Sequence, residues 1–534
     1  MQMNIVDLCV IFLYLFLVTG LGLWSGRNQR TMKDYFLAGR DLPWTAVCLS
    51  VVATETSSLT FISIPGLAYI SNLNFLQIAM GYLAGRIIIS FTLLPAYYKG
   101  EIYTSYQLLS IRFGNTARTY ASLLFQLTRW LADGVRLFAT AIPLSILTGW
   151  SYPLSIAVIM VFTFVYTYFG GIRAVVWMDV FQAFIYLAGA VLAGVILIDK
   201  IDGGWSTVVA TASQTDKLQI FFTGFHLSAA EFWKSNYTLL AGLLGGAFLS
   251  MASHGTDQLM VQRLLACRSV RESQKALIAS GVFIIFQFLL FLLLGVLLFV
   301  YYHGAPMRPD EILPRFVVQD LPTGISGLII AGILAAAMST LSGSVNSLTS
   351  STMLDLYKTR WGKDNPAHKD LRLSRTFALG WTLALVGIAI MFQNRENPVV
   401  ELGLAIASFT YGGMLGVFFL GILNKKAGEQ DALLAMWVAV FFMTWLIGQK
   451  GLILVMMAGL NICCGIWLFK RVKSRLHRIT LVATGAILCA ALLFIAPIQL
   501  GWPWYVVIGS LVAYGTGSIL AIIHGTERKP EIPA

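Results

Sequence analysis

Charged residues are scarce in this chain. Only 12% of its 534 residues are Asp, Glu, Lys or Arg, whereas 57% are hydrophobic. Soluble proteins carry about 25% charged residues, so the composition excludes an ordinary soluble domain. Apolar runs of about 20 residues, the length that crosses a bilayer as a helix, recur along the whole chain. The sequence therefore predicts an all-α, polytopic membrane protein that is surrounded by the lipid bilayer.

Cysteine and histidine are equally rare, with six residues of each. The cysteines have neither the spacing of a metal site nor the pattern of a secreted disulfide framework. No pairing of a nucleophile with a base stands out, so we do not expect an enzyme. Linkers rich in proline, glycine or serine are also missing, which predicts a single transmembrane domain over residues 1–534.

We count about fifteen apolar segments that are long enough to cross a bilayer. The first, residues 5–25, has no basic region before it and no small-residue cleavage site, so we expect a retained helix and not a signal peptide. The segments are expected to begin near Ile5, Pro43, Asn74, Ala117, Tyr152, Val176, Asn236, Ser273, Pro322, Leu371, Val399, Asp431, Gly451, Ile479 and Pro503.

The net charge of +12 follows the predicted topology. Most of the 37 lysines and arginines fall in alternate loops, which lie on one side of the membrane if the segments cross it in turn. Because cytoplasmic loops are rich in Lys and Arg, we predict a multi-pass protein of the cell membrane with its N-terminus outside and its C-terminus in the cytoplasm. The basic excess is no evidence for nucleic-acid binding, and the sequence leaves the oligomeric state open.

Two hydroxyl-rich patches interrupt apolar segments, at residues 53–60 and 336–342. On a helix, each patch places its members on one face, with Ala53, Thr56, Ser57 and Thr60 in the first and Ala336, Ser339, Thr340 and Ser342 in the second. Hydroxyls and freed backbone carbonyls bind sodium in membrane transporters, so the patches predict the two halves of a sodium site. The alternative is structural, because membrane serines and threonines often bond the i−4 carbonyl or a neighbouring helix.

Arginines and acids also remain inside the apolar segments: Arg86, Arg129, Arg136, Glu55, Asp133, Asp179 and Asp257. An intramembrane charge costs at least about 2.5 kcal/mol, which makes each a candidate functional residue. Arg129, Asp133 and Arg136 recur on one helical face, so one arginine has no carboxylate on its own helix. That arginine either pairs elsewhere as a structural ion pair or binds a substrate carboxylate through its bidentate fork. We favour Arg136 for this role, with Arg129 second.

Glu55 and His254 each allow two interpretations. Glu55 is a candidate proton carrier, but it would serve equally well as the partner of Arg86. His254 follows the glycines at Gly245 and Gly246, and it either contacts a substrate or gate or is a packed histidine. Its segment comes about five apolar segments after the first hydroxyl patch, the spacing of the two broken helices in transporters built from inverted repeats.

Several stretches carry a resemblance to a known family: residues 34–40, 168–179, 262–263 and 335–342, followed by Asn346 and Ser347. On these motifs the chain resembles the sodium/solute symporter family of sodium/glucose-type cotransporters over nearly its whole length. Its first core helix is most similar to that of bacterial sialic acid symporters. The resemblance implies the leucine-transporter-type fold, with a five-plus-five inverted-repeat core at residues 43–447. It also implies an extra first helix at 5–25 and additional C-terminal helices at 449–524.

The resemblance further implies Na+ as the coupling ion. The main sodium site that it implies consists of Ala53, Thr56, Ala336, Ser339 and Thr340. Some members bind a second sodium ion, for which the matching residues here are Ser57, Thr60, Ser339, Ser342 and Asp179. Gly343 stands where those members have one further serine.

The predicted substrate site draws on the same broken helices and on the intramembrane arginines. Its candidates are Thr54, Ser57, Ser58, Thr60, Phe75, Arg129, Arg136, Ser253 and His254. A galactose-like pocket is not expected, because residues such as Ala79 and Ser250 replace the polar and aromatic groups of galactose-binding members. The carboxylate-binding arginine of the sialic acid symporters aligns near Ala132, one helical turn from both Arg129 and Arg136.

These features together predict a sodium-coupled secondary active symporter that imports a small polar organic solute by alternating access. The solute that we expect is a carboxylate such as a sialic-acid-like sugar acid. The alternatives are sodium-coupled uptake of a neutral sugar or polyol, a proton-coupled transporter that uses Glu55, and a solute sensor that does not transport. A channel is not expected, because the sequence has no selectivity-filter pattern.

Overall fold

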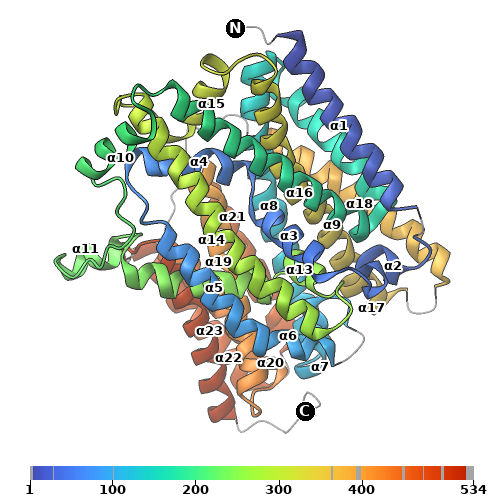
Figure 1. The fold of residues 1–534 in the computed structure, drawn as a ribbon. Helices are drawn as coiled ribbons and strands as arrows, with labels where there is room; N and C mark the ends of the chain where they lie inside the picture. The colour runs from blue at the N-terminus through green and yellow to red at the C-terminus, as the bar shows by residue number, and fades with distance from the viewer. Residues whose placement is uncertain are drawn as a thin grey trace.

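The computed structural model describes residues 4–27, 29–99, 102–362, 365–392, 399–447, 452–472, 474–494 and 498–524. Over these residues it is a bundle of helices (Figure 1). The one extended pairing among them is an isolated parallel bridge between Leu42 and Cys267. The prediction of an all-α protein is confirmed.

The helices follow the predicted apolar segments in order, and short helices lie in the connections. The elements are α1 (Ile5–Ser25), α2 (Met32–Leu37), η1 (Ala38–Arg40), α3 (Trp44–Glu55), α4 (Ser58–Ile70), α5 (Leu76–Phe91), α6 (Leu93–Tyr98), α7 (Ser105–Arg112), α8 (Asn115–Thr148), α9 (Tyr152–Lys200), α10 (Gly204–Gln214), α11 (Ala229–Lys234), η2 (Ala241–Gly245), α12 (Gly246–Gly255), α13 (Gln258–Leu264), α14 (Val270–Tyr301), α15 (Pro309–Gln319), α16 (Ile325–Ser351), η3 (Thr352–Tyr357), α17 (Lys358–Arg360), α18 (Ala367–Met391), α19 (Val399–Leu423), α20 (Glu429–Ile447), α21 (Leu452–Arg471), α22 (Arg475–Phe494) and α23 (Pro503–His524).

Eight of the described helices are long and apolar enough to cross a membrane, or nine if the bent pair α3 and α4 forms one span. Other predicted segments correspond to helices that are broken, as in α12 and α13, or short, as in the 16-residue α5. Still others carry several charges, as α8 does. Each predicted segment contains a helix, but not every one of these helices is long and apolar enough to count as a membrane span by itself.

The first hydroxyl patch lies where one span is broken in two. α3 ends at Glu55, α4 begins at Ser58, and the axes of the two helices differ by 61°. Ser57 and Thr60 cap α4 reciprocally, because each hydroxyl accepts from the backbone N–H of the other residue at 3.4 Å. Serine and threonine compete with helical hydrogen bonds in this way. The continuous face that we expected to join Ala53 to Thr60 is therefore interrupted.

A second break lies in the segment that contains His254. α12 ends at Gly255 and α13 begins at Gln258. The Oδ1 of Asp257 accepts a hydrogen bond from the backbone N–H of Leu259 at 2.9 Å and so caps α13. The two broken helices occupy the matching positions that the sequence predicts.

α9 contains both of the segments that were expected to begin near Tyr152 and Val176. A straight helix of its 49 residues would be about 73 Å long, more than twice the hydrocarbon thickness of a bilayer. Gly171 breaks the helix with φ 53° and ψ −155°, a conformation open essentially only to glycine. A Cβ at this position would also lie 2.9 Å from the ring of Tyr35. The two predicted segments therefore meet at a glycine.

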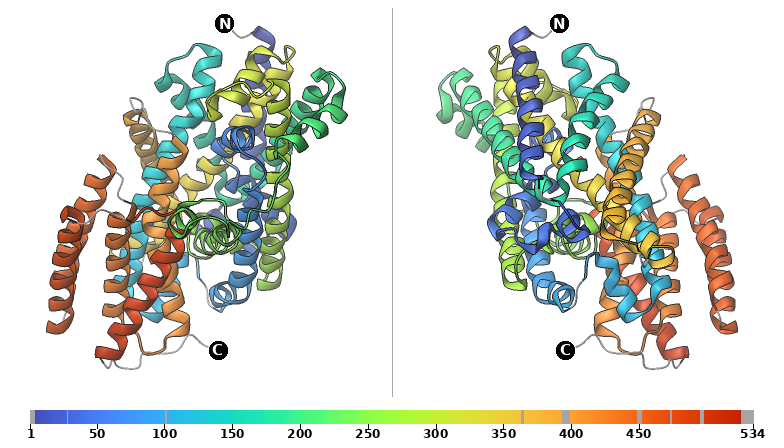
Figure 2. Two further views of the ribbon diagram at one scale, coloured as in Figure 1. Left: turned by 90° about the vertical axis from the view of Figure 1, so that its left-hand side faces the viewer. Right: turned by 90° about the vertical axis from the view of Figure 1, so that its right-hand side faces the viewer.

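α16 forms the centre of the bundle. In its apolar part 89% of the residues are buried, and it contacts α1, α8 and α9. α22 lies at the outer edge against α20 and α21, whereas α23 packs closely on α19 and α20 (Figure 2). α1 begins at one end of the bundle and α23 ends at the opposite end.

Candidate functional site

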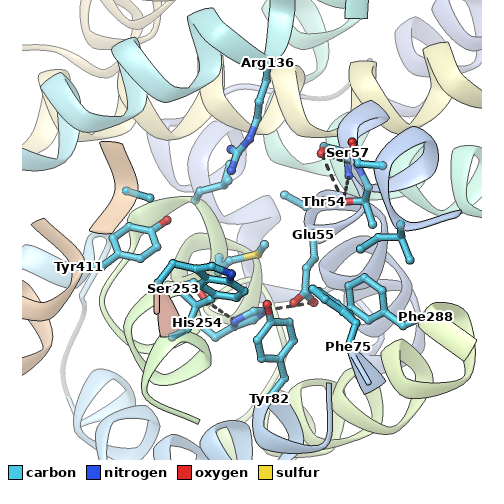
Figure 3. A pocket seen from close by; sticks show the side chains of 18 of the residues that line it. Thr54, Glu55, Ser57, Phe75, Tyr82, Arg136, Ser253, His254, Phe288 and Tyr411 are labelled. Carbon is cyan, nitrogen blue, oxygen red and sulfur yellow. Dashed lines mark hydrogen bonds and ion pairs between the residues drawn. The ribbon is translucent and has the colours of Figure 1, made fainter. Parts of the chain in front are cut away.

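A cavity of about 210 Å³, called the central cavity below, lies beside both helix breaks (Figure 3). Polar groups of α3, α4, α8 and α12 face it together with aromatic rings of α5, α14 and α19. Its lining residues are Thr54, Glu55, Ser57, Thr60, Ser63, Ile64, Phe75, Tyr82, Arg129, Arg136, Leu249, Ser253, His254, Leu259, Met260, Phe288, Ala407, Tyr411 and Trp502.

All of the predicted substrate-binding residues except Ser58 line the central cavity. The side chain of Ser58 is 1% exposed, and its Oγ shares a hydrogen bond of 2.6 Å with the Oγ1 of Thr140. At the first position of α4 this hydroxyl faces α8, so it joins the two helices and does not reach the cavity.

The two hydroxyl-rich patches meet where α16 passes the break between α3 and α4. The Oγ1 of Thr340 donates to the carbonyl oxygen of Thr54 at 3.0 Å and to that of Ala336 at 3.3 Å. Thr340 is 3% exposed and Ala336 is fully buried. The structure thus brings oxygens of both hydroxyl patches together inside the bundle.

The helix break frees backbone oxygens on the α3 side of this site. In an unbroken helix the carbonyl of Ala53 would accept from the N–H of Ser57, but that N–H points to the Oγ1 of Thr60 at 3.4 Å. The hydroxyl of Thr56 donates to the Val52 carbonyl at 2.9 Å and accepts a hydrogen bond from the Nε2 of Gln287. The N–H of Thr60, the helical donor to the Thr56 carbonyl, likewise points to the Oγ of Ser57 at 3.4 Å, so both carbonyls lose their helical partners.

Asp179 lies beside this site among hydrogen-bond donors. Its Oδ1 accepts from the Oγ of Ser339 at 2.6 Å, and its Oδ2 accepts from the Oγ of Ser50 at 2.5 Å. Because Ser339 gives its proton to Asp179, the lone pairs of its hydroxyl remain available to a cation. No group of three or more His, Cys, Asp or Glu side chains that could hold a metal ion occurs within the described ranges. The oxygens predicted to hold a cation at the helix break are hydroxyls and backbone carbonyls, which are neutral.

The residues predicted for a second sodium ion are divided between two places. Ser57 and Thr60 line the central cavity, whereas Asp179 and Ser342 are fully buried. The Oγ of Ser342 donates to the Ser339 carbonyl at 3.0 Å. In the part of the chain that the structure describes, no contact joins this buried group to Ser57 or Thr60.

A buried arginine occupies the space beside Asp179. The Nη2 of Arg263 is 3.0 Å from the Oδ2 of Asp179, and Arg263 is 1% exposed. A Cβ at Gly343 would lie only 2.5 Å from the same Nη2. The guanidinium therefore uses the room left by Gly343 and already supplies a positive charge to Asp179.

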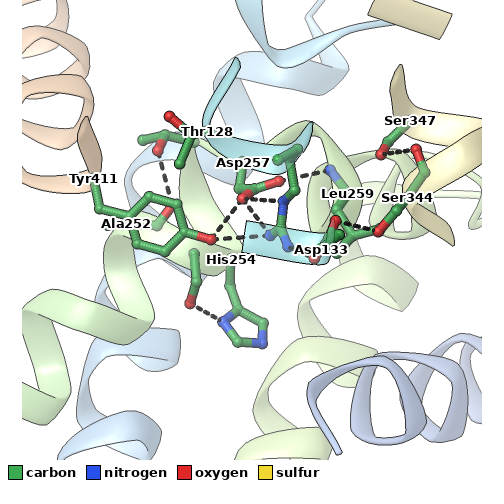
Figure 4. Close-up of polar contacts among 12 residues, drawn as sticks. Thr128, Asp133, Ala252, His254, Asp257, Leu259, Ser344, Ser347 and Tyr411 are labelled. Atoms are coloured by element: carbon green, nitrogen blue, oxygen red, sulfur yellow. Dashed lines mark hydrogen bonds and ion pairs between the residues drawn. The ribbon is translucent and has the colours of Figure 1, made fainter. Parts of the chain in front are cut away.

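Arg129 is paired across the bundle and not only along its own helix. Its Nε and Nη2 donate to the Oδ2 of Asp257 at 3.1 Å and 2.5 Å. The hydroxyl of Tyr411 donates to the same Oδ2 at 2.7 Å and accepts from Arg129 at 2.9 Å (Figure 4). This three-residue cluster, called the Arg129 cluster below, joins α8 and α19 to the break before α13.

Arg136 is more open to the central cavity (Figure 3). Its side chain is 24% exposed, and its Nη1 donates to the Oδ1 of Asp133 at 2.6 Å. Asp133 also accepts from the Oγ of Ser344 at 2.5 Å. A guanidinium has five donors, and no further hydrogen bond to that of Arg136 occurs among the described residues. Arg136 thus keeps more donors for a ligand than Arg129, whose guanidinium already makes four hydrogen bonds.

Glu55 forms an ion pair with Arg86, the second of the two roles considered for it. Arg86 is fully buried and its Nη1 also donates to the Oγ of Ser280 at 2.6 Å. The Nε2 of His254 lies 3.7 Å from the Oε2 of Glu55, on the same side of the cavity (Figure 3). His254 is therefore packed within the wall of the cavity.

Comparison with known proteins identifies the family. Residues 35–439 match the sodium:solute symporter family. The chain belongs to this family. The symporter is 31% identical over 446 residues to the sodium/sialic acid symporter SiaT of Proteus mirabilis (strain HI4320), a match that covers 82% of this chain and 88% of that one. It is also 30% identical over 463 residues to the human sodium/iodide cotransporter, covering 81% of this chain and 69% of that protein.

Solved structures agree with this assignment. A Na+-coupled sialic acid symporter in a substrate-bound outward-open state is similar with a TM-score of 0.80 and 28% identity, over 99% of both chains. The nucleobase-cation-symport-1 family transporter Mhp1 is similar in fold, with a TM-score of 0.51 and 17% identity, over 85% of this chain and 98% of that one. The symporter therefore has the leucine-transporter-type fold, is coupled to sodium, and is a transporter and not an enzyme.

The symporter's cavity contains residues that the sequence analysis missed. The rings of Tyr82 and Phe288 lie 6.3 Å apart at its edge, and Tyr411 belongs to the Arg129 cluster. Trp502 comes from the segment just before α23, and its backbone N–H donates to the Oδ1 of Asn236 at 3.1 Å. No local pattern marks these residues, because helices far apart in the sequence bring them to the cavity. The glycine and hydroxyl signals at the breaks, in contrast, are local.

Proposed function

We propose that the symporter imports a small organic carboxylate together with sodium. The charges around the central cavity already balance, since the arginines Arg86, Arg129 and Arg136 face the acids Glu55, Asp133 and Asp257. A sodium ion held by neutral oxygens at the helix break adds one positive charge to a region where charge is costly. A solute with one negative charge restores neutrality.

The observation that carries this proposal is Arg136, whose guanidinium faces the cavity with unused donors. The N-terminus of α4, capped by Ser57 and Thr60, opens on the same side of the cavity as Arg136 (Figure 3). Helix N-termini favour anions, and broken helices in transporters present such ends to substrate carboxylates. Arg136 and the start of α4 form the anion-binding end of the cavity.

The relatives support an anionic solute. Two proteins at 31% and 30% identity are named as sodium/sialic acid symporters, and one at 30% is a sodium/iodide cotransporter. A sugar acid of the sialic acid kind is therefore the first candidate solute.

The same proposal covers the ion sites and the arrangement in the membrane. One sodium ion binds at Ala53, Thr56, Ala336, Ser339 and Thr340, and a second would use the buried group around Asp179 and Ser342.

We place the N-terminus outside the cell and the C-terminus in the cytoplasm, because Lys and Arg concentrate in the loops expected on the cytoplasmic side. The two termini lie on opposite sides in this arrangement, and α1 begins and α23 ends at opposite ends of the bundle. The extra first helix spans 5–25, the inverted-repeat core 43–447 and the additional helices 449–524, all in one domain.

Uptake into proteoliposomes tests the proposal. With an imposed sodium gradient, N-acetylneuraminate and other organic carboxylates are the first probes, and galactose and inositol are the neutral controls. Arg136→Lys keeps the charge but loses the planar fork, so we expect it to raise the KM for a carboxylate about tenfold or more, the loss of one charge-assisted hydrogen bond. The sodium dependence should change little. Arg315→Lys, on the exposed surface of α15, is the matched control.

Two outcomes would favour the alternatives. Uptake of neutral solutes but not of carboxylates, with normal transport by Arg136→Lys, would make the arginine structural and the solute a sugar or polyol. Uptake driven by a pH gradient without sodium would indicate proton coupling through Glu55 and not sodium coupling.

A further inference from the structure

One buried nitrogen of the central cavity has no hydrogen-bond partner. His254 is 2% exposed and lines the cavity, and its Nε2 is unpaired in the described part of the chain. The nearest acceptor is the Oε2 of Glu55 at 3.7 Å, which is longer than a hydrogen bond. A buried polar atom left unpaired costs free energy, so this nitrogen calls for a ligand.

The surroundings of His254 decide which proton its ring carries. The Nδ1 is 2.8 Å from the Oγ of Ser253, whose hydroxyl acts either as donor or as acceptor. Nε2 faces the Glu55 carboxylate. A proton on Nε2 is attracted to this negative charge, whereas a lone pair on Nε2 would be repelled by it. The Oγ of Ser253 also lies 3.3 Å from the Ser250 carbonyl oxygen. Its contact with Nδ1 is the shorter of the two, so we assign the hydroxyl proton to the bond with Nδ1 and the ring proton to Nε2. The cavity wall then presents a donor, Nε2–H, next to an acceptor, the Glu55 carboxylate.

One oxygen atom on the cavity side of this pair can contact both groups. An oxygen about 2.8 Å from each group bridges a separation of 3.7 Å. It must accept from Nε2–H and donate to Glu55, which a hydroxyl does and a methyl group does not. The Oε1 of Glu55 has no hydrogen-bond partner among the described residues, and the side chain is 14% exposed, so the carboxylate has an acceptor to spare.

An ammonium group fits this place poorly. Arg86 already neutralises Glu55, so an ammonium would bring an unbalanced positive charge into the cavity in addition to sodium. An ammonium also has no lone pair with which to accept from Nε2–H. Both arguments favour a neutral hydroxyl over an amine.

We infer that the solute carries a hydroxyl group which is bound between His254 and Glu55, at the side of the cavity opposite Arg136 (Figure 3). This rests on the proposed function, because it names the second contact of the same solute. The substrate class is thus a hydroxylated carboxylate, with its carboxylate at Arg136 and a distant hydroxyl at His254. Glu55 and His254 select against the deoxygenated and the amino forms of the same acid.

The test compares matched solutes in the presence of sodium. The probes are N-acetylneuraminate and its monodeoxy and amino analogues, together with ω-hydroxy acids of graded chain length and their deoxy and ω-amino counterparts. Competition for sodium-driven uptake gives the affinity of each. We expect the hydroxylated member of at least one set to bind about tenfold more tightly than its deoxy and amino counterparts, the effect of one buried hydrogen bond.

Variants of His254 test whether the difference in affinity between hydroxylated and deoxy solutes arises at His254. His254→Phe keeps a planar ring but has no N–H, so it should bring the hydroxylated solute to the affinity of its deoxy form while leaving the deoxy form unchanged. His254→Gln restores a donor and should recover part of the preference. His226→Phe, on the exposed loop before α11, is the matched control and should keep the full preference. Glu55→Gln is less suitable, because it leaves the buried Arg86 without its partner.

The outcomes separate the two proposals. If no carboxylate is transported with sodium, the proposed function fails. If carboxylates are transported but the deoxy or amino forms bind as tightly as the hydroxylated ones, the proposed function stands and the hydroxyl site is wrong. A preference for the hydroxyl that survives in His254→Phe also overturns the assignment.

Discussion

Two neighbouring hydroxyls of α16, those of Ser339 and Thr340, belong to the proposed sodium site. Ser339 gives its proton to Asp179, and Thr340 gives its proton to the Thr54 carbonyl. Each hydroxyl thereby has a fixed orientation and keeps lone pairs for a cation. Because the surrounding side chains are buried, water does not replace a lost oxygen at low cost.

We therefore expect Ser339→Ala and Thr340→Ala each to weaken the apparent affinity for sodium by about 1–3 kcal/mol. The measurement is the sodium dependence of uptake and of thermal stability in the purified protein. Ser347→Ala is the matched control, since this hydroxyl lies on the same helix and only donates to the Ser344 carbonyl at 3.1 Å. Unchanged sodium dependence in both variants would refute the site.

Asp179 and Arg263 give a second expectation. Asp179→Asn removes the partner of a buried guanidinium, which should destabilise the fold by about 3–5 kcal/mol, seen as a lower Tm in detergent. The double variant Asp179→Asn/Arg263→Gln should recover part of the loss, whereas Ser50→Ala should cost much less. If Asp179→Asn instead keeps its Tm and lowers the Hill coefficient for sodium, Asp179 serves a second ion.

These side chains show what the sequence could reveal. The hydroxyls of residues 53–60 marked the helix break, since hydroxyls within apolar segments are a local signal, whereas those of residues 336–342 lie in the continuous helix α16. The excess arginine beside Asp133 was also visible. The pairing of Arg129 with Asp257 could not be predicted, because the two residues lie 128 positions apart in the sequence. The same holds for the hydroxyl of Ser58, whose partner Thr140 depends on how α4 packs on α8.

Among the helices, α1 is tied to the central helix α16 by a single carboxylate. The Oδ1 of Asp7 accepts from the backbone N–H of Gly324 at 2.7 Å and of Gly327 at 2.8 Å. These groups belong to the N-terminus of α16, which begins at Ile325 and has no capping side chain of its own. The extra first helix thus supplies the cap of a core helix.

Asp7→Ala should lower the stability of the symporter by about 1–2 kcal/mol, because it removes the cap and a charge that suits a helix N-terminus. Asp7→Asn keeps an acceptor and should cost less. Thermal unfolding in detergent measures both. Glu311→Ala, in the exposed first turn of α15, should leave the Tm unchanged. Equal effects of Asp7→Ala and Glu311→Ala would show that Asp7 does not cap α16.

The helices also differ in how far the sequence predicts them. Glycine and hydroxyl residues foretell the breaks in α3–α4 and α12–α13, because they change local backbone preferences. The packing of α23 against α19 and α20, which brings Trp502 to the cavity, has no corresponding local signal in the sequence. Apolar helices in lipid look alike in sequence, so their neighbours follow from packing of small residues that a linear pattern does not resolve.

For the transporter as a whole, the Arg129 cluster separates two cavities. Arg129 and Tyr411 line both the central cavity and a small cavity that also includes Thr128 and Met414. The small cavity lies toward the end of the bundle that we place in the cytoplasm. Alternating access requires a path from the central cavity to this side, and the cluster joins helices that must then move apart.

Tyr411→Phe should shift the symporter toward the state that is open to the cytoplasm. It removes the hydroxyl that contacts Asp257 and Arg129 at 2.7 Å and 2.9 Å, while the Arg129–Asp257 ion pair keeps the fold. One such hydrogen bond contributes about 0.5–1.5 kcal/mol, so the population of the inward-open state should rise several-fold.

The measurement is the labelling of Met414→Cys by a membrane-impermeant thiol reagent applied from the cytoplasmic side, in a chain whose six natural cysteines are replaced. Labelling should be faster in Tyr411→Phe, and sodium should slow it, because sodium binding favours the outward-facing state in which the broken helix packs on α16. Tyr186→Phe, whose hydroxyl contacts Gln287 at 3.0 Å outside the cluster, is the control. Equal labelling in the two variants would mean that the Arg129 cluster is not the barrier on the cytoplasmic side.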